Sequence, residues 1–239
     1  MAFHAKLISR DRLAADVCVF RLEKPEGFRF LAGQYCLFSV PDMGFQDDRG
    51  LRRPFSIASS PLERELLFVT KLSGSAMKRT MAEMALGTEI GLEQAAGPLV
   101  LPERTDTPLA FLAGGIGIAP FRAMCRYATD APTVHDITLF YSSRTPEETP
   151  FLEELQRMPS QSERLNVAVS MTRAADGPGQ WTGLTGRLNG EMIKDHCKSW
   201  EKAAYYVAGP PAMADAMKQT LEAMSIPASR IKMELFAGY

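Results

Sequence analysis

The chain has 239 residues, with 27 Lys and Arg against 28 Asp and Glu, so its formal charge is −1. This balance gives no electrostatic reason to expect binding to nucleic acid or to an anionic membrane. With 46% hydrophobic and 23% charged residues, the composition is that of a globular protein large enough for one big core or two smaller ones.

No apolar run is long enough to cross a bilayer, and the first residues lack the uninterrupted apolar stretch of a secretion signal. The cysteines, Cys18, Cys36, Cys125 and Cys197, lack the close spacing of a zinc site or of a cysteine-ligated iron–sulfur cluster. We therefore expect a cytoplasmic protein with reduced thiols and no metal site.

The N-terminal part is predicted to form an antiparallel sheet or small β-barrel. Short β-rich runs occupy 17–23, 34–40 and 65–72, and turns rich in Gly, Pro and charged residues separate them. Two prolines and several charges interrupt the apolar pattern over 101–108. We place a domain boundary there, which divides the chain into domains at 1–103 and 104–239.

The second domain is predicted to be an α/β domain with an open parallel sheet, because apolar strands alternate with helical segments. The expected strands are 109–114, 137–143, 165–171 and 205–209, and the expected helices are 118–128, 149–158 and 211–224. The glycines of 173–186 indicate an exposed loop.

Two Gly- and Pro-rich turns, Gly114–Pro120 and Ala208–Pro211, each connect a predicted strand to a predicted helix. Glycine lets the backbone turn sharply and approach a pyrophosphate, and the free N–H groups of the helix start attract its charge. Either turn alone is also explained as a tight connection. Together, at the carboxyl ends of strands in one sheet, they favour a dinucleotide crevice.

In the N-terminal part, Arg53–Ser56 combines a cation, an aromatic ring and a hydroxyl on an extended segment. A flat ligand with a phosphate tail could be held there at several points. The alternative is that Phe55 is a core residue and Arg53 a solvated charge.

These three segments, in this order, resemble the signatures of the ferredoxin-NADP reductase family of flavin- and nicotinamide-dependent oxidoreductases. Arg53–Ser56 is similar to its Arg-x-Tyr/Phe-Ser/Thr motif, Gly114–Pro120 to its G-G-x-G-x-x-P motif, and Ala208–Pro211 to its C-G-P-P motif. The likeness covers essentially the whole chain. It implies an FAD-binding β-barrel domain at 1–103 and an NAD(P)H-binding domain at 104–239.

For the flavin, the resemblance implies that Arg53 pairs with the pyrophosphate, that Phe55 lies against the isoalloxazine, and that Ser56 binds near the hydride-accepting nitrogen. The signature residues are Arg53, Pro54, Phe55 and Ser56. A second segment, Gly74–Lys78, resembles the family's Gly-x-x-x-Thr phosphate-binding segment, with Lys78 in place of the usual hydroxyl. Its expected phosphate contacts come from Gly74, Ala76, Met77 and Lys78, with the alternative that the Lys78 ammonium points to solvent.

For the nicotinamide nucleotide, the resemblance implies that Gly115, Gly117 and Pro120 approach the pyrophosphate and that Gly114, Gly209 and Pro210 belong to the same cofactor site. Ala119 and Ala208 stand where the family often has Thr and Cys. Ser143, Arg144 and Arg173 follow strands at the expected edge and suit a 2′-phosphate, which favours NADPH, with NADH as the alternative.

The C-terminus carries an aromatic residue, as in many members of the family. Tyr239 is therefore predicted to cover the flavin and to act as a lid, with Phe236 as the competing residue. Glu234 is a candidate for proton delivery, and its alternative is a surface carboxylate. We group Ser56, Tyr239 and Glu234 as the candidate catalytic residues.

The predicted activity is hydride transfer between NAD(P)H and FAD, with electrons passed to a separate acceptor. The resemblance implies that this acceptor is ferredoxin or flavodoxin. Such a partner would dock on a basic patch formed by Arg49, Arg52, Lys78 and Arg79. The alternatives are a free-flavin or quinone reductase, the reductase component of an oxygenase, and, from another class, a non-catalytic electron-transfer subunit.

Overall fold

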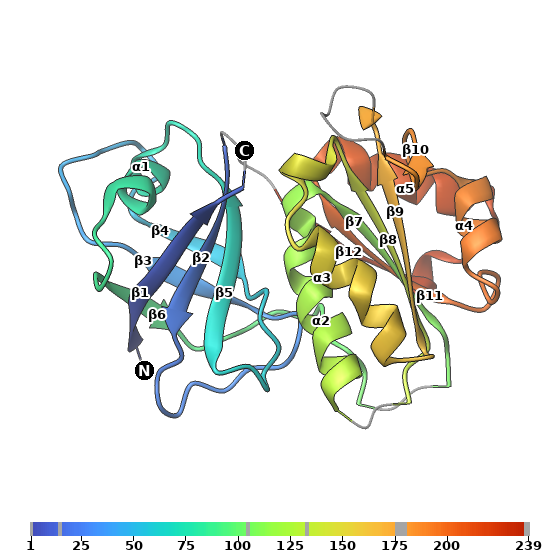
Figure 1. The fold of residues 1–239 in the computed structure, drawn as a ribbon, viewed down its shortest axis with the longest axis horizontal. Helices are drawn as coiled ribbons and strands as arrows, with labels where there is room; N and C mark the ends of the chain where they lie inside the picture. The colour runs from blue at the N-terminus through green and yellow to red at the C-terminus, as the bar shows by residue number, and fades with distance from the viewer. Residues whose placement is uncertain (1, 14–15, 104–105, 132–133, 175–180, 237–239) are drawn as a thin grey trace.

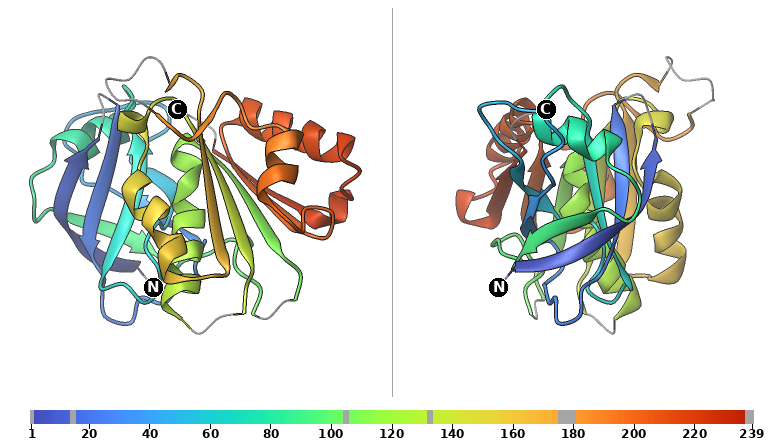
Figure 2. Two further views of the ribbon diagram at one scale, coloured as in Figure 1. Left: turned by 45° about the vertical axis from the view of Figure 1, so that its right-hand side comes forward. Right: turned by 90° about the vertical axis from the view of Figure 1, so that its left-hand side faces the viewer.

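The computed structural model describes residues 2–13, 16–103, 106–131, 134–174 and 181–236. It contains two six-stranded sheets, one in each half of the chain (Figure 1). The first sheet is antiparallel, runs in the order β4-β3-β6-β1-β2-β5, and curls into a barrel (Figure 2). Its elements are β1 (Ala2–Arg12), β2 (Val17–Glu23), β3 (Tyr35–Ser39), β4 (Arg52–Ser56), β5 (Glu65–Lys71), α1 (Ala76–Glu83) and β6 (Glu89–Glu93).

The second sheet is parallel, in the order β10-β9-β8-β7-β11-β12. Helices α2 and α3 cover one face, and α4 and α5 cover the other (Figure 2). Its elements are β7 (Leu109–Gly114), α2 (Ile118–Asp130), β8 (Ile137–Ser143), α3 (Leu152–Arg157), β9 (Leu165–Met171), β10 (Leu184–Thr185), α4 (Gly190–His196), β11 (Ala204–Gly209), α5 (Pro211–Ala223) and β12 (Ile231–Leu235).

The predicted fold class, an antiparallel barrel followed by an open parallel α/β sheet, is confirmed. Strands β2, β8 and β9 have the predicted bounds. The division at 103/104 stays a prediction, and residues 104–105 lie outside the described residues.

Strands β2 and β5 show why the two halves pack tightly. Successive side chains of a strand point to opposite faces. In β2, Phe20 belongs to the core of the barrel, whereas Val19 belongs to a cluster that continues to the buried face of α2. In β5, Phe68 and Val69 divide in the same way. The barrel therefore has an apolar outer face against which α2 packs.

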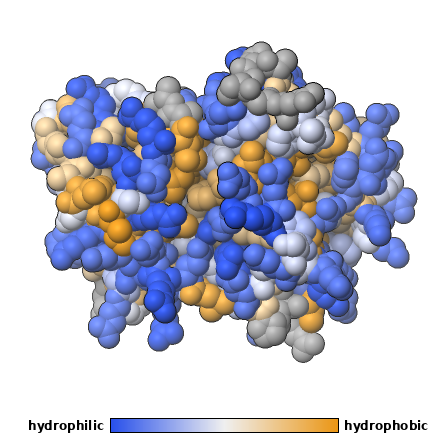
Figure 3. Space-filling model, in the orientation of Figure 1, coloured by the Kyte–Doolittle hydropathy of each residue, from blue (hydrophilic) through white to orange (hydrophobic). Residues whose placement is uncertain are grey.

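No helix among the described residues is long and apolar enough to cross a bilayer. The face seen in Figure 3 is largely hydrophilic, and its apolar side chains form small separate patches.

Candidate active site between the two sheets

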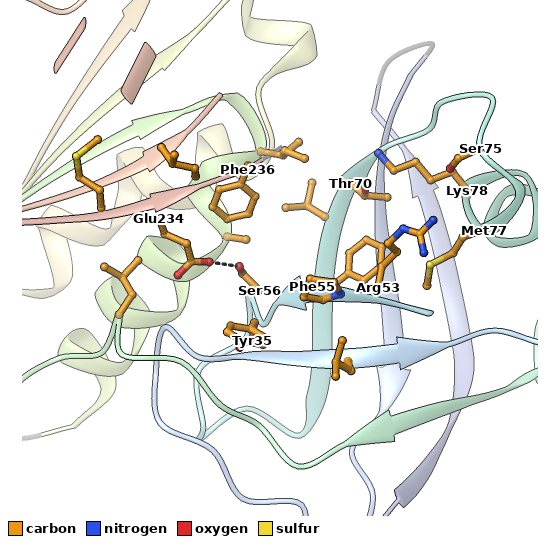
Figure 4. A pocket seen from close by; sticks show the side chains of 18 of the residues that line it. Tyr35, Arg53, Phe55, Ser56, Thr70, Ser75, Met77, Lys78, Glu234 and Phe236 are labelled. Atoms are coloured by element: carbon orange, nitrogen blue, oxygen red, sulfur yellow. Dashed lines mark hydrogen bonds between the residues drawn. The ribbon is translucent and has the colours of Figure 1, made fainter. Parts of the chain in front are cut away.

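A cavity of about 850 Å³ lies where the barrel meets the end of the second sheet. Strand β4 and the start of α1 form one side, and Lys232–Phe236 forms the other (Figure 4). The barrel side includes the predicted flavin residues Arg53, Pro54, Phe55, Ser56, Met77 and Lys78. The structure thus brings the two predicted flavin segments into one cavity.

A hydrogen bond joins the two halves inside this cavity. The Ser56 hydroxyl donates to Glu234 Oε1 at 2.9 Å, across a sequence separation of 178 residues (Figure 4). Burial raises the pKa of Glu234, and the hydrogen bond from Ser56 opposes that rise. Glu234 is therefore a half-buried acid that keeps its proton to a higher pH than an exposed glutamate, and its role in proton delivery stays a prediction.

The opposite end of the cavity is cationic. Arg49, Arg53 and Lys78 line it, and Lys71 lies close enough to affect Lys78 electrostatically. Burial, together with the positive charges of Arg49, Lys71 and Arg53, lowers the pKa of Lys78 to about 8, and Asp16 opposes this shift. Mutual repulsion of this kind is relieved when an anion binds among the cations.

Arg53 has donor capacity left for such an anion. Its Nη1 donates to the carbonyls of Arg49 and Arg52. Its Nη2 is buried without a hydrogen-bond partner among the described residues, and its ion pair with Asp47 Oδ1 spans 3.8 Å. A buried donor of this type is usually satisfied by a ligand or by water.

Asp47 occupies the start of α1, where a phosphate contact was predicted. Its Oδ2 accepts from the Ala76 N–H at 2.7 Å, and its Oδ1 accepts from the Arg49 N–H at 2.8 Å. These backbone hydrogen bonds, that from Ala76 first, lower the pKa of Asp47. The N–H of Ala76 is thus engaged by a carboxylate, and Gly74 is exposed and does not line the cavity.

A second cavity, of about 190 Å³, lies at the carboxyl ends of the parallel strands. Predicted nucleotide residues line it, namely Gly114, Gly115, Ser143, Arg144 and Pro210. Val17 and Lys71 reach it from the barrel, and Ile116 lines both cavities. The two cavities therefore meet at the turn that precedes α2.

Gly117 and Gly209 serve the packing of the two Gly-rich turns rather than lining a cavity. A Cβ on Gly117 would lie 2.3 Å from the Ala208 carbonyl oxygen, and one on Gly209 would lie 3.2 Å from Gly114 Cα. A side chain at Gly117 would push the backbone apart, and one at Gly209 would make a tight contact, because the two turns cross in direct contact.

Three further predicted residues lie elsewhere. Pro120 is buried in α2 and lines neither cavity. Arg173 is exposed, and its backbone N–H donates to the Arg144 carbonyl at 2.9 Å. Tyr239 lies outside the described residues, whereas Phe236 lines the first cavity above Ser56 (Figure 4).

Several lining residues were missed from the sequence. Tyr35 and Thr70 line the first cavity, Lys71 and Glu148 line the second, and Asp47 contacts α1. The only sequence signal for Lys71 is its position at the end of a β-rich run, and Asp47 lies in a charged turn that reads as solvent-exposed. Their roles depend on pairings between distant segments.

The arrangement fits an aromatic ring system with a phosphate tail. Pro54, Phe55 and Leu37 supply apolar wall, Arg53 and Lys78 supply cations at one end, and Glu234 supplies an acid at the other. Apolar walls with a few convergent polar groups are typical of cofactor sites. The second cavity offers a nucleotide the glycine backbone and Arg144.

Comparison with known proteins finds oxidoreductase domains and reductase components that are similar to this chain. A family model described as "Oxidoreductase NAD-binding domain" matches residues 111–219. The reductase component of propane 2-monooxygenase from Rhodococcus jostii is 25% identical over 95% of this chain and 62% of its own length. The electron transfer component of anthranilate 1,2-dioxygenase from Acinetobacter baylyi is 28% identical over 87% of this chain and 58% of its own length. The chain thus spans about 60% of these two relatives.

Among solved structures, a ferredoxin NADP+ reductase from Neisseria gonorrhoeae with bound FAD and NADP superposes with a TM-score of 0.77 and 26% identity, covering 98% of both chains. The ferredoxin reductase of carbazole 1,9a-dioxygenase gives a TM-score of 0.80 at 22% identity, covering 99% of this chain and 69% of its own.

Proposed function

Because the chain belongs to the ferredoxin-NADP reductase-like family, we propose that it is a flavoprotein oxidoreductase that transfers hydride between NAD(P)H and FAD. The observation that carries this proposal is the meeting of the two cavities at Ile116. A flavin ring in the first cavity and a nicotinamide entering from the second would come together at this junction. Hydride transfer requires such contact and no further reagent.

On the flavin side, Arg53 and Lys78 would bind the pyrophosphate, since both line the cationic end of the cavity. The backbone of Ala76 and Met77 would join them once the carboxylate of Asp47 yields its hydrogen bond. Phe55 and Pro54 would lie along the ring system.

At the ring end, Ser56 and Glu234 would act as a pair. The bound flavin and nicotinamide supply the hydride acceptor and donor. The Ser56 hydroxyl, oriented by Glu234 at 2.9 Å, would contact the reacting edge of the ring. Glu234 would hold a proton close to that edge, and Phe236 would cover the ring and exclude water. A role for Tyr239 as a lid stays a hypothesis.

On the nucleotide side, Gly114, Gly115 and Pro210 would face the pyrophosphate, with Lys71 reaching across from the barrel. Ser143 and Arg144 would bind a 2′-phosphate, which favours NADPH. Glu148 lines the same cavity and supports the alternative, because a carboxylate accepts hydrogen bonds from the ribose 2′-hydroxyl of NADH.

The proposed acceptor is a separate protein, either ferredoxin or flavodoxin. The face beside the flavin cavity carries Arg49, Arg52 and Arg79, although Arg52 pairs with Glu93 and Arg79 stacks over Phe45 at 4.1 Å. An acidic partner would bind such a face in a salt-dependent way. The names of the relatives favour a second candidate, the reductase component of an oxygenase.

The experiment is a steady-state comparison of acceptors with the purified, flavin-loaded chain. Salt-sensitive reduction of ferredoxin or flavodoxin supports the proposed acceptor, and faster, salt-independent reduction of free flavin or quinone supports a small-molecule reductase. A flavoprotein inert to both NADPH and NADH would favour a non-catalytic electron-transfer subunit.

A further inference from the structure

Arg122 is a buried cation that lines neither cavity. It lies in α2, only 4% of its surface is exposed, and it is absent from the lining of both cavities. A buried guanidinium is costly unless its donors and its charge are satisfied. The hydrogen-bond partners of Arg122 therefore indicate its structural role.

The guanidinium contacts both halves of the molecule. Its Nη1 donates to the Ala58 carbonyl at 3.0 Å and to Glu63 Oε2 at 2.5 Å, and its Nη2 donates to Glu63 Oε1 at 3.0 Å. Ala58 and Glu63 belong to the barrel half. From the second half, Glu154 of α3 accepts from Nη2 at 2.5 Å and from Nε at 3.1 Å. All the guanidinium donors are thus used.

The two barrel residues that contact Arg122, Ala58 and Glu63, follow β4, the strand that carries Arg53–Ser56. Ala58 lies two residues beyond Ser56, and its own N–H donates to the Leu67 carbonyl of β5 at 2.7 Å. Glu63 Oε2 also accepts from the Ser60 N–H at 2.5 Å, so the carboxylate is held by the same loop. Movement of Arg122 would therefore be transmitted to the end of β4.

The other end of the connection is the nucleotide turn. Helix α2 begins at Ile118, directly after Gly115–Gly117, and Arg122 lies about one helical turn further on. Arg122 thus connects the segment that carries Ser56 to the helix that starts at the proposed pyrophosphate site.

We propose that Arg122, through its bidentate contact with Glu63 and its bond to Ala58, is a positioning residue that sets the distance between the flavin and the nicotinamide. This inference rests on the proposed hydride-transfer function. Small errors in this distance are costly, since a misplacement of about 1 Å can lower a rate about a hundredfold. Arg122 touches neither ring and acts only through the two segments that it joins.

Arg122→Lys is the principal test variant. Lysine keeps the charge but lacks the planar fork that grips both Glu63 oxygens. Glu63→Gln weakens the same connection from the barrel side and leaves the pair with Glu154 intact, so it serves if Arg122→Lys folds poorly. Two variants are matched controls. Glu154→Gln weakens the contact within the second half, and Arg126→Lys alters an exposed pair with Asp130 on the same helix.

The assay is anaerobic stopped-flow reduction of the bound flavin over a range of NADPH or NADH concentrations, with flavin content and thermal midpoint measured in parallel. We expect the limiting rate to fall about tenfold to a hundredfold in Arg122→Lys and Glu63→Gln. The nucleotide Kd should stay within about twofold, and the nucleotide–flavin charge-transfer absorbance should weaken. Both controls should reduce at the parental rate.

If the flavin of the parent is reduced and all four variants are reduced at the same limiting rate, the positioning role is overturned and the proposed function stays intact. A limiting rate that falls equally in Glu154→Gln and Glu63→Gln would also overturn the positioning role. The fall in rate would then reflect a general loss of protein stability and not the contact between Arg122 and the barrel. A flavin-loaded parent that neither nucleotide reduces would overturn the proposed function, and the positioning role with it.

Discussion

The lowered pKa of Lys78 predicts that phosphate-dependent flavin binding weakens in mild alkali. Lys78 has a pKa of about 8 because it is buried among Arg49, Lys71 and Arg53. A bound pyrophosphate would stabilise its charged form and return the pKa toward the ordinary 10.5. Binding would then take up a proton above pH 8. With these two values, proton linkage makes the affinity about tenfold weaker at pH 9 than at pH 7.

The assay is quenching of FAD fluorescence by flavin-depleted protein at pH 7 and pH 9. Lys78→Arg is the matched variant, because arginine stays charged over this range and its affinity should change little. Riboflavin is the matched ligand, since it lacks phosphate and its binding should not follow Lys78. An unchanged Kd for FAD in the parent, or an equal loss in Lys78→Arg, would refute the reasoning.

Three further predictions concern single substitutions. Arg53→Ala should weaken FAD binding by about 1.5–3 kcal/mol, since it removes hydrogen bonds to charged phosphate, and equilibrium titration of flavin-depleted protein checks this. Gly117→Ala should lower the free energy of unfolding by about 1–3 kcal/mol, because its Cβ would meet the Ala208 carbonyl, and thermal unfolding checks it. Glu234→Gln should flatten the pH dependence of unfolding. The unfolded parent releases the Glu234 proton near the ordinary pKa of 4.5, whereas the folded parent keeps it to a higher pH. The free energy of unfolding of the parent should therefore fall as the pH rises from 4.5 through the raised pKa of folded Glu234. Chemical denaturation across that pH range would show whether the Glu234→Gln variant lacks this fall.

The sequence predicts well what depends on local periodicity. Strands β8 and β9 are short, largely apolar segments bounded by polar turns, and the structure gives them the predicted bounds. The two turns are equally local, because each lies between a predicted strand and a predicted helix and Gly115 has the positive φ that favours glycine. The sequence does not show that Gly117 and Gly209 are needed for packing, since this depends on how the turns cross.

Contacts between distant segments could not be predicted in the same way. The pairing of Ser56 with Glu234 depends on where the last strand joins the parallel sheet. Asp47 reads as a turn residue, and only the folded loop brings it to the start of α1. Arg122 follows the proline of a recognised motif, yet its partners belong to two other segments whose positions no local pattern specifies.

The central claim is that the flavin cavity and the nucleotide cavity work together. Its most direct test is an absorbance spectrum of the purified protein, followed by anaerobic titration with NADPH and separately with NADH. We predict a flavin band that bleaches near one equivalent of NADPH, with a weaker response to NADH. Bleaching by NADH alone would contradict the roles given to Ser143 and Arg144. A protein that neither retains nor binds flavin would contradict the account of Arg53–Ser56 and the proposed function.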